Sequence, residues 1–273
     1  MPIDPTVITP QSVALYYARR FSAAATDYFR RLDLAGLRVT AYDAVNARLI
    51  DRLVANGGNF WPDSGAFNAM AGYLFPTAGT LIPLHPSHDA GTLINFVSGD
   101  WNAVTGLKGD GSTKHIDSNR TTNNQNDNSC GVWVSNFPAD FGGPVGNMIA
   151  KGSNSVAGST LIGIRASDAR INTSNSETSV VSSSPVSITK GYYGNSRSSG
   201  TSYVRRFNNN SETLARDSEA PNEVSFLIFS SPSSNFFIGN LALYHIGPNL
   251  NGAGELAEFD AAITEWATGL AAA

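Results

Sequence analysis

From about residue 92 onward, the chain consists of short β-prone segments separated by turns rich in Gly, Asn, Asp and Pro. Several short strands punctuated in this way predict a mainly β fold, a two-sheet antiparallel jelly-roll sandwich. One segment, 224–229, is apolar on both faces of the expected strand, so it is predicted to lie in the centre of a sheet. The predicted strands are 92–97, 114–117, 131–134, 161–165, 187–190, 202–207, 224–230 and 236–246.

Helical patterns flank this β region. Apolar residues recur every three or four positions from Val13 to Leu32, which predicts one long amphipathic helix. A second helix is expected to begin at Asp43 and to end where Asn-Gly-Gly occupies 56–58. A closing helix is expected over 253–269, because apolar side chains return there at helical spacing. N-terminal helices and a C-terminal helix therefore accompany the predicted sandwich.

The charge distribution divides the chain into two parts. Residues 1–60 carry seven Arg against five Asp, whereas the whole chain has a net charge of −4. This asymmetry predicts an N-terminal helical docking arm over 1–39 and a sandwich domain over 40–273. The domain includes a leading helix, an irregular connection at 59–91 that contains four prolines, and the closing helix 253–269.

The arm is predicted to make assembly contacts. Its aromatic stripe is expected to be buried against a partner, and its arginines are expected to meet acidic partner surfaces. Sandwich edges and this stripe together favour a homo-oligomer. The predicted contact residues are Tyr17, Arg19, Arg20, Phe21, Tyr28, Arg30 and Arg31.

Composition excludes several other classes of protein. A net charge of −4 and a pI near 5.5 give no basic field, so nucleic-acid binding is not expected. The single cysteine, Cys130, excludes an intrachain disulfide framework and is predicted to be buried and inert. The first residues lack the pattern of a signal peptide, so the chain is expected to be cytosolic when it is made. No apolar run approaches the roughly 18–20 residues that would predict membrane insertion.

Three motifs bear on cofactor or metal binding. Segment 106–114 approaches a phosphate-binding loop, but Ser112 stands where that loop requires lysine, so a tight hairpin with Asp110-Gly111 at its corner is predicted. The histidines of 85–89 are flanked by prolines and are predicted to form a surface turn rather than a zinc site. Segment 124–128 is predicted to be a polar loop leading into a strand, and occupancy by calcium stays open. No cofactor or resident metal is expected.

Acidic and aromatic side chains are the candidates for catalysis and for sugar binding. Asp217 and Glu219 form the only close acidic pair of the β region, and a turn is predicted there, so glycan hydrolysis is the least favoured class. Glu258 and Asp260 are expected on the exposed side of the closing helix. No catalytic residue is therefore assigned. Aromatic rings beside amides suit glycan contact, although ordinary cross-strand packing explains the same residues. The candidates for glycan contact are Tyr192, Tyr193, Asn195 and Tyr203.

Several strings occur in an order that resembles a known family. They are AGTLINF at 90–96, GLKGDGSTKHID at 106–117, QNDNSCGVWV at 125–134, GNSRSS at 194–199, FIGNL at 237–241 and LNGAGELAEFDAAITEW at 250–266. The series resembles the concanavalin A-like (laminin G-like) jelly-roll domain of tailed-bacteriophage virion proteins, over roughly residues 40–270. The resemblance carries no catalytic residue across, and segment 1–39 lies outside it.

This resemblance implies a non-enzymatic structural protein located in the virion. Its expected position is the tail (fibre or tip) or the capsid surface (decoration), with other virion proteins as partners. The alternative is a carbohydrate-binding module for host-surface glycans. A glycan hydrolase is the third class.

Overall fold

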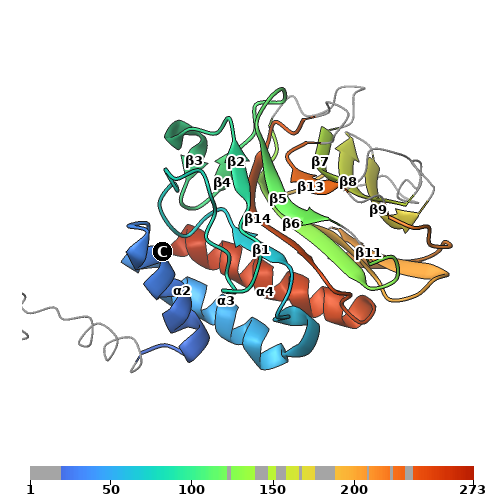
Figure 1. Cartoon of the computed structure of the whole chain (residues 1–273), viewed down its shortest axis with the longest axis horizontal. Coiled ribbons are helices and arrows are strands. Elements are labelled where there is room, and N and C mark those ends of the chain that lie inside the picture. Colours follow the sequence, from blue (N-terminus) through green and yellow to red (C-terminus); the bar gives the residue numbers. More distant parts are fainter. Residues whose placement is uncertain are drawn as a thin grey trace, which may run out of the picture.

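The structure is a computed structural model that describes residues 20–121, 124–138, 147–151, 158–165, 168–175, 188–207, 209–221, 224–230 and 236–273. These residues form two antiparallel sheets accompanied by helices near both ends (Figure 1). The predicted mainly β class with N-terminal and C-terminal helices is therefore confirmed. The described helices are α2 (Ala23–Leu34), α3 (Asp43–Asn56) and α4 (Ala253–Ala272), with short 3-10 turns at Thr40–Tyr42, Gly58–Phe60 and Ser98–Asp100.

The first sheet contains eight of the described strands. Their order is β12-β11-β10-β6-β14-β4-β3, and β1 pairs with β14 beside β4. All of these pairings are antiparallel. The strands are β1 (Ala66–Ala69), β3 (Trp101–Asn102), β4 (Gly106–Lys108), β6 (Asn128–Asn136), β10 (Gly191–Arg197), β11 (Ser202–Phe207), β12 (Asn210–Ala215) and β14 (Asn240–Gly247).

The second sheet contains six described strands in the order β2-β5-β13-β7-β8-β9. Strand β13 pairs with β5 on one side and β7 on the other, so the predicted central position of segment 224–229 is confirmed. The strands are β2 (Thr92–Ile94), β5 (His115–Thr121), β7 (Asn147–Lys151), β8 (Ser159–Arg165), β9 (Asp168–Asn175) and β13 (Ser225–Ile228).

The first sheet is the middle of three layers, with helices on one face and the second sheet on the other (Figure 1). Alternate residues of β6 show this arrangement. Val132 and Val134 belong to the core between the sheets, whereas Trp133 belongs to the core beneath the helices. On β10, Tyr193 and Tyr192 divide in the same way. Because successive side chains of a strand point to opposite faces, a strand covered on both sides needs apolar residues at both sets of positions.

Helix α2 belongs to this three-layer unit. Ser22 caps its first turn by accepting a hydrogen bond from the Ala25 amide at 3.2 Å. Tyr28, Phe29 and Leu32 are buried in the same core as the apolar face of α4. The predicted arm 1–39 is therefore wrong for residues 20–39, which are part of the domain, and residues 1–19 lie outside the described part of the chain.

The predicted corner at Asp110-Gly111 is present, but the hairpin predicted around it is not. Gly111 has φ +72°, and the Asp110 carboxylate accepts hydrogen bonds from the amides of Ser112, Thr113 and Lys114, as expected at a tight Asp-Gly corner. Strand β4 nevertheless lies in the first sheet and β5 in the second. The corner therefore carries the chain between sheets, and the hairpin prediction is wrong.

The boundaries of the other elements agree with most of the pattern. Helix α3 begins at Asp43 and ends at Gly57, whose φ of +60° suits glycine, as predicted. Strand β11 has the predicted bounds. By contrast, the described residues of segment 187–190 are not a strand, and β10 begins only at Gly191.

Candidate functional site

The predicted glycan contacts are buried inside the sandwich. Tyr192 and Tyr203 are each 2% exposed, and Tyr193 and Asn195 are 0% exposed. Tyr193 donates its hydroxyl to Thr189 O at 2.7 Å, and Tyr203 donates to Ile171 O at 3.2 Å. A ligand in solvent cannot reach the polar groups of these residues, and only the ring of Tyr192 borders a groove, so this prediction is wrong. Cross-strand packing, the alternative interpretation, accounts for them.

Tyr192 instead lies in a slot made by two glycines. Gly131 of β6 and Gly194 of β10 are cross-strand partners, and a Cβ at either position would lie 2.3 Å from the Tyr192 hydroxyl oxygen. The absence of side chains lets the phenol lie across both strands, where its oxygen forms a hydrogen bond with Nε2 of His245 at 2.6 Å. Burial lowers the pKa of His245 to about 3, so its ring is neutral.

The histidine turn is buried as well. His85 and His88 are 8% and 6% exposed, their ring centroids are 4.7 Å apart, and Trp61 packs against both rings. Nε2–H of His88 donates to Pro62 O at 2.7 Å, and burial lowers the pKa of His88 to about 4. The segment forms a turn with Pro86 and Ser87 exposed, as predicted, but its two histidine rings are buried beside Trp61. Across the described residues, no group of three His, Cys, Asp or Glu side chains is placed to hold a metal ion.

The buried histidines His88 and His245 give the stability of the fold a pH dependence. In an unfolded chain both would titrate near pH 6.5, above their folded pKa values of about 4 and about 3. The unfolded state therefore binds more protons below pH 6.5, so stability is lost as the pH falls from about 6.5 toward 4 for His88 and toward 3 for His245.

We expect the free energy of unfolding to fall by about 1.4 kcal/mol per pH unit for each histidine across its window. Urea titrations at pH 7, 6 and 5 measure this slope. The variant His88→Gln should reduce the slope by about half. Equal free energies of unfolding at pH 7 and pH 5 for the unmodified chain would contradict the assignment.

The remaining candidate reactive groups have fixed internal partners. Cys130 is buried as predicted, and its pKa is raised to about 12 by burial. Asp260 is 2% exposed and pairs with Arg206 at 2.6 Å, so its predicted place on the exposed side of the helix is wrong. Glu258 is exposed as predicted. Asp217 and Glu219 lie in a segment without regular structure after β12, as the predicted turn requires.

The polar segment 124–128 leads directly into β6, as predicted. Asn128 donates its side-chain amide to Asn124 O at 2.7 Å and to Gln125 O at 3.2 Å. These bonds close the loop on itself.

The predicted assembly contacts separate into an inner and an outer face of α2. Tyr28 is fully buried, and Arg31 donates to the backbone oxygens of Pro83 and Leu84, so these two residues serve the fold and their prediction as partner contacts is wrong. Phe21 packs edge-on against Phe29 with ring centroids 4.9 Å apart. Tyr17 and Arg19 lie outside the described residues.

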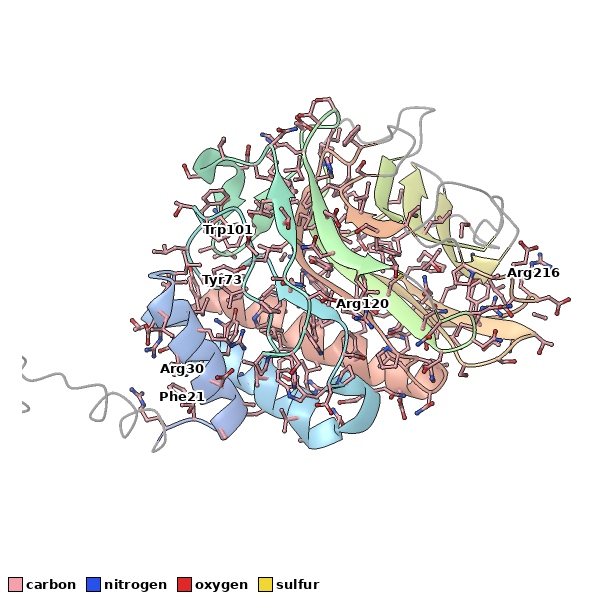
Figure 2. The ribbon with its side chains drawn as sticks, viewed as in Figure 1. Phe21, Arg30, Tyr73, Trp101, Arg120 and Arg216 are labelled. Carbon is pink, nitrogen blue, oxygen red and sulfur yellow. The ribbon has the colours of Figure 1, made fainter. Side chains whose placement is uncertain are left out.

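The exposed surface that we call the outer face of α2 comprises Arg30 and Leu34 of the helix and Arg20, which lies three residues before the helix begins. The Arg30 side chain is 62% exposed, and Leu34 is 77% exposed. Figure 2 shows Arg30 on this helix and Phe21 just before it at one border of the molecule, with Arg216 at the opposite border. This outer face is held rigidly, because the inner face of the same helix is part of the core.

A further site, which the sequence did not indicate, is a groove of about 410 Å³ between α4 and the helix-facing side of the first sheet. Trp133 lies in it, and Lys190 stands at its border. A tryptophan inside an apolar strand pattern and a lysine just before a strand are ordinary residues, so sequence alone carries no sign of this groove.

Comparison with models of known protein families and with curated proteins finds no match for this chain. Within the part of the chain that the structure describes, no helix combines the length and the apolar character needed to cross a membrane.

Proposed function

We propose that this chain is a non-enzymatic structural component of a tailed-bacteriophage particle, positioned on the tail or on the capsid surface. The assignment to a virion rests on the ordered strings between residues 90 and 266, which resemble the jelly-roll domains of such particles. Two antiparallel sheets are compatible with that resemblance. Fold alone does not specify function, so the docking surface carries the structural part of the proposal.

The outer face of α2 is the observation that favours a docking role. Arg30 and Leu34 project from a helix whose opposite face is fixed in the core, and Arg20 is exposed just before that helix, so a partner meets a preorganised surface. An exposed leucine one helical turn from Arg30 suits an acidic neighbour with an apolar centre. Other virion proteins, or further copies of this chain, are the proposed partners.

Internal pairing of the chemically reactive groups also favours a structural role. Cys130, His88, His245 and Asp260 are all buried, and each contacts a partner within its own chain. Enzyme active sites instead place perturbed groups where substrate reaches them. The glycan-binding alternative loses its four candidate residues to the core, so we do not propose it.

The docking role is tested by reversing charge on the outer face of α2. The double variant Arg20→Glu/Arg30→Glu should keep the fold, because both side chains are exposed, and should reduce incorporation into particles about tenfold. Quantitative mass spectrometry of purified particles measures incorporation. The matched control is Arg216→Glu, at the opposite border of the molecule, which should incorporate normally. Incorporation of the double variant at the level of the unmodified chain would overturn the docking surface.

Removal of residues 1–39 is not a suitable test. That segment contributes Tyr28, Phe29 and Leu32 to the core, so its loss would unfold the domain and mimic a docking defect.

A further inference from the structure

The groove beneath α4 has the dimensions of a ligand site. Its volume of about 410 Å³ falls within the range of roughly 300–1,000 Å³ that small-molecule sites occupy. Val104, Ala267 and Ala271 line it together with the rings of Trp133 and Tyr192, so much of its wall is apolar. One wall is the last turns of α4, and the floor is the ends of β6 and β10.

Trp133 brings an unused hydrogen-bond donor to this groove. Trp101 donates its indole N–H to Tyr73 O at 3.0 Å, and Trp266 donates to Asn46 Oδ1 at 2.9 Å. Trp133 is only 8% exposed, yet its indole N–H has no partner among the described residues. Among the described residues, the polar atoms that are fully enclosed and unpaired do not include the indole nitrogen of Trp133. Its N–H is therefore open to the groove that Trp133 lines.

Lys190 adds the only charge among the described residues that line the groove. It is exposed just before β10, and no described residue forms an ion pair with it. An ammonium and an indole N–H both donate and neither accepts. The hydroxyls of Thr264 and Thr268 already donate to Asp260 and to Thr264 O, respectively. Lys190 and Trp133 therefore offer donors without accepting, the neutral side chains of Asn209 and Thr105 add polar groups of either kind, and no described lining residue carries a carboxylate.

We propose that this groove binds a small organic acid, a carboxylate carried on an apolar or aromatic body. The carboxylate accepts from the Trp133 indole and pairs with Lys190, while the body lies against Ala267 and Ala271 of α4. A charge-assisted hydrogen bond from a nearly buried donor supplies most of the selectivity for an anion over a neutral ligand. This site is separate from the outer face of α2, so it does not depend on the proposed docking role.

Phenylacetate is the probe, and nuclear magnetic resonance of the ¹⁵N-labelled full chain is the readout. The chain has four tryptophans, and the Trp133 indole resonance is identified by its loss in Trp133→Phe. Phenylacetate should shift the Trp133 resonance saturably. The resonances of Trp101 and Trp266 should stay in place, because their N–H groups already have partners. Phenylacetamide, the neutral isostere, should bind at least about fivefold more weakly.

Two variants and one control complete the test. Lys190→Met should weaken phenylacetate binding about fivefold, and Ala267→Leu should abolish it by filling the groove. Lys108→Met removes an exposed lysine outside the groove and should change nothing. The proposal is overturned if phenylacetate leaves the Trp133 resonance unmoved. It is also overturned if phenylacetate binds Lys190→Met, and phenylacetamide binds the unmodified chain, as tightly as phenylacetate binds the unmodified chain. Because Lys190 is exposed, that variant keeps the test decisive even if Ala267→Leu fails to fold.

Discussion

Replacing Asp260 by alanine is expected to lower the free energy of unfolding by roughly 3–5 kcal/mol, a large fraction of the stability of a typical domain. Asp260 of α4 and Arg206 of β11 form an ion pair of 2.6 Å in which both side chains are at most 10% exposed. Arg206 also donates to the Ser211 hydroxyl at 2.9 Å, and Thr264 donates to Asp260 at 3.0 Å. Removal of the carboxylate leaves a buried guanidinium without its counter-charge.

The matched control for this prediction is Glu265→Ala on the same helix. Glu265 pairs with Arg52 at 2.8 Å and with Arg48 at 3.5 Å, but its side chain is 44% exposed. Water and salt screen this pair, so its loss should cost at most about 1 kcal/mol. Chemical unfolding of both variants at pH 7 measures the difference. Equal effects of the two substitutions would show that α4 is not anchored through Asp260.

Gly131→Ala is expected to destabilise the fold by roughly 2–4 kcal/mol. The new Cβ would lie 2.3 Å from the Tyr192 hydroxyl oxygen and 2.6 Å from Nε2 of His245. Phe259 of α4 covers both rings, so the tyrosine cannot move aside without opening the contact between helix and sheet. The buried hydrogen bond between Tyr192 and His245 would be lost together with this packing.

Gly254→Ala is the control for the glycine slot. A Cβ there meets nothing within 4 Å, and the residue lies in helix α4. Alanine favours helix over glycine, so this variant should be neutral or should gain up to about 1 kcal/mol. Thermal unfolding compares the two variants directly. Gly131→Ala with the stability of the unmodified chain would contradict the slot.

Strands and helices with a strong, single periodicity were predictable from the sequence. Helix α3 ends before Gly57, so its C-terminal boundary follows from capping chemistry, whereas its start at Asp43 has no side-chain cap and the Asp43 carboxylate accepts from Arg38 instead. Strand β13 is apolar on both faces and occupies a central position, as expected. Burial of Cys130 also followed, because the apolar strand segment 132–134 comes directly after Gly131.

Strand β10 of the first sheet was not predictable from its local pattern. Strand β10 has the sequence GYYGNSR, whose small and polar residues resemble a turn when read locally. Gly194 is nevertheless required because Tyr192 crosses it, and that contact depends on pairing with β6. Tertiary contacts of this kind override strand propensity. Packing on the two faces of the first sheet buries the four residues that suit glycan contact in the sequence.

Candidate surfaces could be predicted only in part. The number of arginines in the N-terminal segment predicted a docking surface. Sequence could not show that Arg31 faces inward to Pro83 and Leu84 while Arg30 faces solvent. The two residues are adjacent in the helix, and which of them faces inward depends on the position of segment 83–84 beside that helix. Likewise, the unpaired indole of Trp133 depends on where α4 ends above the sheet.

Antibody labelling of intact phage particles tests the central claim, that this chain is a structural part of a virion. Gold-conjugated antibodies raised against the full chain, viewed by electron microscopy, should label one defined location on the tail or on the capsid surface. Particles from a phage with the corresponding gene deleted should carry no label. Abundant chain in the lysate with no label on purified particles would contradict the account.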